Sequence, residues 1–347
     1  MSTDHLVDRR VFRTTVIIVA TLASAYAMWR LSDLLLLVFA CALIALIFLN
    51  LARWLSGRTG LGIGLSLGAA VIAILAFLTS AFSFFGQSLS AEFTELAQRL
   101  PAAWATFQER VSQTTMGRLI IERAADYAPN GQSVLGFVTS LVTGFGAAVS
   151  AFAIILVGGI YLAAQPQLYR RGVMMLTPQS ARGKLSRTFA AVAESLNQWL
   201  LGQGIGMVFV GIATTIGLWV VGVPAAPAIG LVAGLCEFVP YLGTIVVTIP
   251  AVILGFAEST TTGIWTIVVL VVVQQVQGNL VMPLLQSKMV ELPPALTIFS
   301  LVAAGVLLGP LGVLLATPLT VVAMVVIKAV YVQPEDLELA DRAQLDM

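Results

Sequence analysis

One acidic residue, Glu237, stands in an apolar stretch that has no other charged residue between Gly202 and Phe256. A carboxylate deep in a membrane costs roughly 2.5 to 3.5 kcal/mol on insertion scales, so it needs a partner, an ion or a proton. Pro240 and Gly243 follow closely and break the helix, and the backbone groups that are freed must be buried in protein or line a cavity. We therefore expect Glu237, Pro240 and Gly243 to belong to a substrate or ion site. A neutral carboxylic acid hydrogen-bonded to freed backbone is the alternative.

Four amides form a second candidate feature within six residues: Gln274, Gln275, Gln277 and Asn279. Gln275 and Asn279 share one helix face because they are four residues apart, and Gln274 and Gln277 share the neighbouring face. We expect at least one of these faces to lie against the interior or a polar cavity. Amides suit neutral ligands rich in hydroxyl groups, and adhesion between helices explains them equally well. Gln203 is a weaker candidate because it lies near a membrane boundary.

A second group of prolines and glycines, in Ala304–Val322, repeats the arrangement found in Ala233–Ile253. The matching positions are Ala233, Gly234, Pro240, Gly243, Thr248 and Pro250 against Ala304, Gly305, Pro310, Gly312, Thr317 and Pro318. Paired interrupted segments in two halves of a chain indicate the substrate site of a transporter. The candidate site therefore also includes Gly309, Gly312 and Pro318.

Each broken segment has two interpretations. A re-entrant hairpin of about 12 residues in each direction would bring its tip near the middle of a ~30 Å hydrocarbon core, and a kinked span would cross that core. Lys288 and Glu291 would lie on the cytoplasmic side for hairpins and on the external side for spans. One charge of each sign does not decide between them, so both shapes stay open.

The composition predicts an all-α integral membrane protein. Of 347 residues, 59% are hydrophobic and only 10% are charged, whereas soluble domains are roughly a quarter charged. The formal net charge of +1 does not indicate nucleic acid binding, because the charged residues are in tails and loops and form no basic face, so we expect no nucleic acid partner. Cys41 and Cys236 lie in apolar runs, so we expect free, buried thiols.

No residue pattern indicates an enzyme. The chain has no HExxH or Walker motif, and its only histidine, His5, is in the N-terminal tail. We therefore expect no metal or other cofactor. An ion gradient, of protons or sodium, is the expected energy source for any transport.

About eight hydrophobic segments divide the chain, two of them the broken ones. We expect a cytoplasmic tail at 1–13, three transmembrane helices at 14–91, an amphipathic extramembrane helical insert at 92–140 broken at Pro101, a fourth span with a basic loop at 141–198, a transport core at 199–332 and an acidic tail at 333–347. Arginines near the membrane at the N-terminus, at Arg53 and Arg58 and between Arg170 and Arg187 place these loops and both termini in the cytoplasm.

Four motifs resemble those of the autoinducer-2 exporter family of bacterial permeases, in order and in spacing, over roughly 172–328. They are Glu237-Phe-Val-Pro240-Tyr-Leu-Gly243, Val273–Asn279 leading to Pro283, Leu292-Pro293-Pro294, and Gly309-Pro310-Leu-Gly312 followed by Ala316-Thr-Pro318. Members usually carry an acid at the position of Glu237. The doubled proline at Pro293 and Pro294 departs from the usual single proline and stiffens that loop.

The resemblance implies a multi-pass protein of the bacterial inner membrane that moves a small polar solute or a monovalent cation across the lipid bilayer. Family members are associated with export of the furanone-type signal autoinducer-2, a quorum-sensing molecule, and some with sodium or lithium/proton antiport. A ring of identical subunits, such as a pentamer, would be in keeping with the family. A passive channel or an oligomeric membrane scaffold is the competing class of function.

Overall fold

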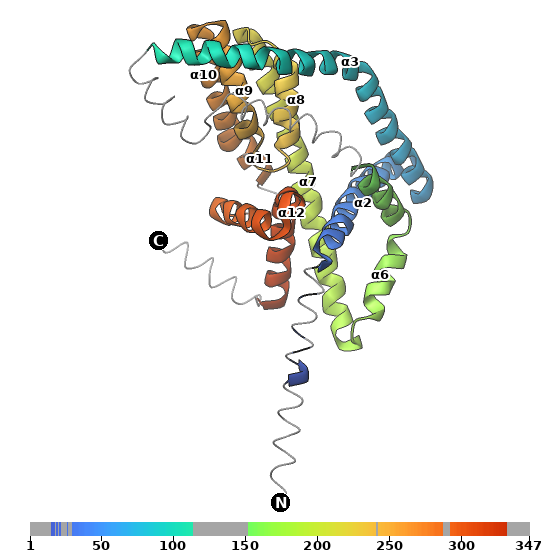
Figure 1. Ribbon diagram of the computed structural model, residues 1–347. Helices are drawn as coiled ribbons and strands as arrows, with labels where there is room; N and C mark the ends of the chain where they lie inside the picture. The colour runs from blue at the N-terminus through green and yellow to red at the C-terminus, as the bar shows by residue number, and fades with distance from the viewer. Residues whose placement is uncertain are drawn as a thin grey trace, which may run out of the picture.

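The computed structural model describes residues 30–113, 152–240, 242–286 and 292–331, with isolated positions 15–17, 19, 21 and 26. Every element in these ranges is a helix, which confirms the prediction of an all-α protein for this part of the chain (Figure 1). The labelled helices are α2 (Ser32–Thr59), α3 (Ile63–Ser112), α6 (Pro166–Met175), α7 (Gln179–Val221), α8 (Ala226–Cys236), α9 (Leu242–Glu258), α10 (Thr260–Val276), the π-helix η1 (Gln277–Val281), α11 (Met282–Gln286) and α12 (Pro294–Tyr331).

Four helices of the described chain are long and apolar enough to cross a membrane. They are Ser32–Thr59, Gln179–Val221, Thr260–Leu284 and Pro294–Ala329, and a fifth span arises if Phe152–Ala164 and α6, which are bent by 80°, count as one. The apolar helices α8, α9 and Ile63–Phe77 are shorter. The chain is therefore a multi-pass helical membrane protein by length and composition, and the number of eight segments stays a prediction.

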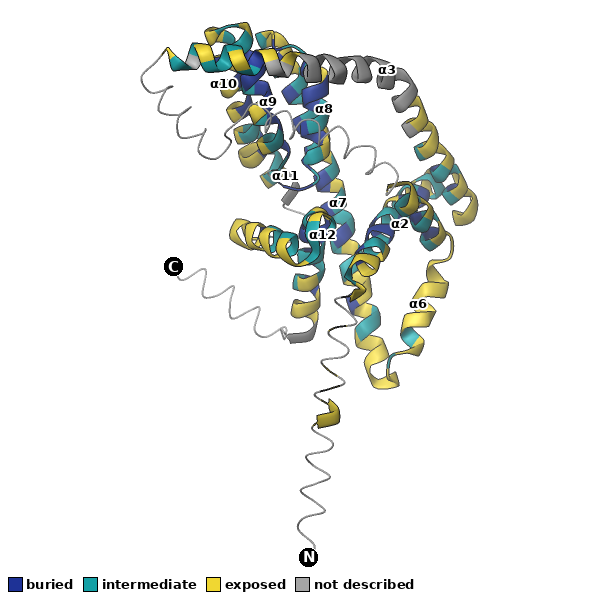
Figure 2. Cartoon of the chain, in the orientation of Figure 1, coloured by how far each residue is buried: buried dark blue, intermediate teal, exposed yellow. Residues whose placement is uncertain are grey.

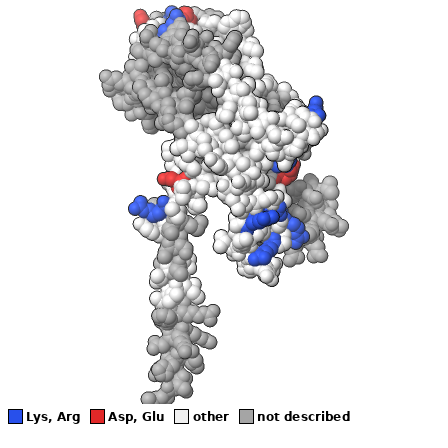
Figure 3. Space-filling view, turned by 90° about the vertical axis from the view of Figure 1, so that its right-hand side faces the viewer, with Lys and Arg blue, Asp and Glu red and all other residues white. Residues whose placement is uncertain are grey.

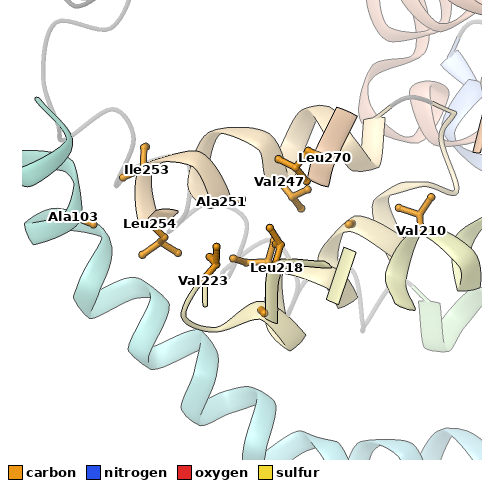
Figure 4. Packing of buried hydrophobic residues seen from close by; sticks show 12 residues of the cluster. Ala103, Val210, Leu218, Val223, Val247, Ala251, Ile253, Leu254 and Leu270 are labelled. Atoms are coloured by element: carbon orange, nitrogen blue, oxygen red, sulfur yellow. The ribbon is translucent and has the colours of Figure 1, made fainter. Parts of the chain in front are cut away.

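Three buried clusters hold these helices together, while their outer faces are exposed and apolar (Figure 2). The first joins α7, α8, α9 and α10, where Leu218, Val247 and Leu254 point toward one another (Figure 4). The second joins α2, α7 and α12, and the third joins α2 to the helix Phe152–Ala164. Exposed side chains such as Ile212 and Val271 fit contact with lipid, since lipid tails are as apolar as they are.

The amphipathic insert differs from its prediction at Pro101. Helix α3 continues through residue 101 to Ser112, so the expected break is absent. A proline inside a helix costs about 3 kcal/mol, but burial of a large apolar side chain returns roughly 1.5 to 3 kcal/mol. Trp104 and Phe107 pack against the first cluster, and we attribute the continuity of α3 to this packing. The remainder of the insert, 114–140, lies outside the described residues.

The end of α3 also binds the end of α9. The Arg110 guanidinium donates from Nη1 to the main-chain oxygen of Phe256 at 2.9 Å, and the rings of Phe107 and Phe256 meet edge to face with centroids 5.7 Å apart. The last carbonyls of a helix have no partner inside it, so Arg110 caps α9. The insert thus packs on its own chain at the point where α9 ends.

The basic stretch that was predicted as a loop is helical. It forms α6 and the first turns of α7, and Arg170 Nη2 donates to Ser186 Oγ at 2.5 Å between the two helices. A patch of lysine and arginine side chains lies over this pair in the space-filling view (Figure 3). The largest group of basic side chains on this face therefore lies where α6 meets α7.

Both predicted breaks are present, but they have different shapes. Helices α8 and α9 are short, pack against each other, and are separated by a break that includes residues 237–240. In α12 the break is a single residue, Gly309, with φ 67° and ψ −157°. Only glycine adopts that conformation readily. The first segment is a helical hairpin and the second is a kinked helix, and their placement relative to a bilayer stays a prediction.

Gly309→Ala should destabilise the protein, because a Cβ is strained at this backbone conformation by about 1 to 3 kcal/mol. We expect a melting temperature several degrees lower in thermal unfolding of the detergent-purified chain. Gly204→Ala is the control, since this helical glycine has open space around its Cβ position and should melt at or above wild type. Equal melting of the two variants would contradict the strained kink.

Candidate functional site

The break between α8 and α9 is built from tight turns around a proline. Pro240 has no N–H for a continuing helix, so α8 ends at Cys236. The chain then turns through hydrogen bonds from Val239 N to Cys236 O at 3.1 Å and from Leu242 N to Val239 O at 3.0 Å. The turns do not supply donors for all the main-chain oxygens at the end of α8. Those oxygens need hydrogen-bond donors from neighbouring helices.

Glu237, in this break, is held by two glutamines from other helices. It is 2% exposed, and its carboxylate Oε1 accepts a hydrogen bond from Nε2 of Gln277 at 2.7 Å. Its main-chain oxygen accepts one from Nε2 of Gln203. The two glutamines are as deeply buried as Glu237, at 2% for Gln203 and 3% for Gln277. Three elements, α7, the α8–α9 break and η1, therefore meet at one polar centre inside an apolar core.

Gly243 lets α9 approach this centre. A Cβ built on Gly243 would lie 2.6 Å from Oε2 and 2.8 Å from the main-chain nitrogen of Glu237, and it would also collide with the oxygen of Ala233. Gly234 has the same role between α8 and α7, where a Cβ would lie 2.8 Å from the oxygen of Met207. The site is thus enclosed by backbone at positions where any side chain would clash.

The amide cluster is divided between the interior and the surface. Gln277 is buried, and Gln274 is partly buried and accepts a hydrogen bond from Thr244 Oγ1 of α9 at 2.5 Å. Gln275 and Asn279 are exposed. The face that carries Gln274 and Gln277 therefore meets the hairpin, and the neighbouring face points outward.

Gln277 lies on a π-helical turn, which is an unusual place for a site residue. η1 runs from Gln277 to Val281, between two α-helical segments of one span. π-turns are rare and occur frequently at functional sites, because their extra residue per turn alters the direction of side chains. The turn begins at the residue that binds Glu237.

Apolar side chains beside both breaks pack against the second cluster. Phe238, next to Glu237, packs against the second cluster, which also includes Leu308 and Leu311 on either side of Gly309. The ring of Phe238 meets that of Trp199 at 5.6 Å and an interplanar angle of 81°. The two breaks therefore share one packed cluster.

Gly312 and Pro318, also predicted for the site, are buried in the kinked helix, where α12 packs on α7 and α2. Thr317 Oγ1 and Gln277 Oε1 are buried and have no hydrogen-bond partner in the described part of the chain. Lys288 and Glu291, which were to distinguish hairpins from spans, lie outside the described residues.

Gln203 was ranked low from the sequence, and the structure gives it a central position. A signal for it exists, because Trp199, Gln203 and Gly206 are spaced four and three residues apart and so share one face of α7. Cys41 and Cys236 are free as predicted, although only Cys41 is buried and Cys236 is partly exposed.

Chemically, the site offers a desolvated carboxylate, two amide donors and one amide oxygen that has no partner among the residues that the structure describes. Such a group binds a proton, a monovalent cation or a hydroxyl group, because each relieves the cost of a charge or polar atom in an apolar core. Among the described residues, no three His, Cys, Asp or Glu side chains come together as a metal site.

A sequence profile described as AI-2E family transporter matches residues 16–332. The chain belongs to the AI-2E transporter family. The resemblance seen in the four motifs is therefore confirmed, and the long apolar helices and the family together identify a membrane transport protein.

Relatives in this family include YueF of Bacillus subtilis (strain 168), which is 28% identical over 276 residues, covering 80% of this chain and 72% of that protein. YrrI of the same organism is 28% identical over 162 residues, 47% of this chain and 46% of that protein. YhhT of Escherichia coli (strain K12) is 25% identical over 198 residues, which cover 55% of this chain and 54% of that protein. The names of all three describe them as candidate transport proteins.

Substituting Gly243 tests the enclosure of the site. Gly243→Ala should force the break away from α9 and destabilise the chain by about 1 to 3 kcal/mol, the usual cost of overpacking. Gly206→Ala is the matched control, since its Cβ would lie 3.8 Å from Gln277 Nε2, an ordinary contact. Thermal unfolding should separate the two, and a tolerated Gly243→Ala would refute the close approach of α9 to Glu237.

Proposed function

We propose that this AI-2E family member is a secondary transporter that exports a small polar solute of the autoinducer-2 type by alternating access. The proposal rests on the buried Glu237, which is held by Gln203 and Gln277 at a helix break between packed helices. A binding group at the junction of broken helices suits alternating access, because a few backbone bonds separate one packing from another. Membership in the family supports the solute class.

Glu237 has the coupling role in this proposal. A buried carboxylate that gains or loses a proton or a sodium ion changes the charge of the apolar core, and this change favours one packing of the hairpin over another. The partnerless oxygen of Gln277 adds an acceptor beside the carboxylate. It would serve a solute hydroxyl during export.

Sodium or lithium/proton antiport is the second candidate. The same two groups, the carboxylate of Glu237 and the amide oxygen of Gln277, supply oxygen ligands, which hard monovalent cations prefer. Flux that saturates and follows a gradient separates both carriers from a passive channel. Absence of any flux would favour a membrane scaffold.

We also propose that the chain lies in the bacterial inner membrane with both termini in the cytoplasm. The basic patch over α6 and α7 supports this orientation, since positive residues stay on the cytoplasmic side (Figure 3). We further propose a ring of identical subunits, which would account for the exposed amides of Gln275 and Asn279. They are exposed on an apolar span and would find partners in a neighbouring subunit.

Glu237→Gln should abolish transport that depends on pH or sodium and leave expression and folding intact, because the amide keeps the shape of the side chain but does not ionise. The measurement is flux of furanone-type solute, and of sodium, in proteoliposomes with an imposed gradient. Glu194→Gln is the control, since Glu194 is on the surface, where its carboxylate accepts from Gln198 at 3.0 Å. Unchanged gradient-dependent flux in Glu237→Gln would remove this residue from the mechanism.

A further inference from the structure

One face of α7 contacts both the break that carries Glu237 and the glutamine that binds its carboxylate. Trp199 packs edge to face on Phe238, Gln203 donates to the main-chain oxygen of Glu237, and a Cβ on Gly206 would lie 3.8 Å from Gln277 Nε2. The three residues of α7 follow one another at helical spacing, so the helix presents them as a single stripe. This stripe is the surface on which the break rests.

Gln203 differs from Gln277 in what it touches. Gln277 donates to the carboxylate of Glu237, and Gln203 donates to the main-chain oxygen of the same residue. The oxygen that Gln203 satisfies belongs to the residue immediately after α8, where helix termination leaves carbonyls unpaired. No water is expected to replace this donor in an apolar core, and Gln203 is itself 2% exposed.

We infer that Gln203 is a positioning residue of the transport site: its amide fixes the α8–α9 break against α7, and the carboxylate of Glu237 therefore meets Gln277. The inference rests on the proposed function and adds a condition to it. When the hairpin moves relative to α7 during alternating access, the bond from Gln203 to Glu237 must open and close. Gln203 thus influences both the geometry of the acid and the rate of the conformational step.

The test uses the full chain in lipid nanodiscs and infrared difference spectroscopy. The carboxyl bands of Glu237, as acid or as carboxylate, are assigned by their loss in Glu237→Gln. Gln203→Met keeps the length of the side chain and removes the donor, so we expect these bands to shift and the maximal rate of gradient-driven flux to fall at least tenfold. Gln198→Met, on the exposed side of α7, is the control and should leave bands and flux as in wild type.

A role of Gln203 in folding alone would lower the melting temperature and leave the Glu237 bands in place, and this result would overturn the inference. Gln203→Asn keeps a buried amide but shortens it by one methylene, so it provides the same test if Gln203→Met does not fold. Intact flux in Glu237→Gln would defeat the proposed function while the band shift still supports the role of Gln203. If Glu237→Gln loses flux but the Glu237 carboxyl bands are unshifted in both Gln203 variants, the proposed function stands and the positioning role of Gln203 is refuted.

Discussion

The structure depends on supplying partners to main-chain groups that a proline releases inside an apolar core. Pro240 ends α8, and the oxygen of Glu237 then needs a donor that neither water nor lipid supplies. Gln203 is that donor, and it lies 34 residues earlier in the chain. The close packing of α7 on α8, the glycine at the start of α9 and the buried first residue of the π-turn η1 all bring these groups together.

The sequence predicted features that are local in the chain. Pro240 and the glycine of the second break marked both interruptions, and the spacing of Gln274 and Gln277 placed them on one face, because such signals need only neighbouring residues. The partnership of Gln203 with Glu237 was not predicted, since the spacing of Trp199, Gln203 and Gly206 marks one face of α7 but does not identify the distant main-chain oxygen that Gln203 binds. Helix continuity through Pro101 was missed for a related reason: tertiary packing overrode a local breaker.

The C-terminal part of α3 contacts both ends of the hairpin at its base. Ala103 is buried in the same cluster as Val223, which precedes α8, and Arg110 binds the main chain of Phe256 near the end of α9. The hairpin is therefore fixed at its base by apolar packing and a cap, and at its tip by two amides. The two ends of the hairpin are therefore held by different kinds of contact.

Cys236 gives this arrangement a built-in reporter. It is the residue directly before Glu237 and is partly exposed, whereas the other thiol, Cys41, is enclosed near Gly158, where an added Cβ would lie 2.5 Å from its sulfur. A thiol reagent small enough to enter the wild-type protein would thus react one residue away from the acid and leave the second cysteine untouched. The rate at which Cys236 is labelled would therefore report the solvent accessibility of the hairpin tip in the wild-type chain.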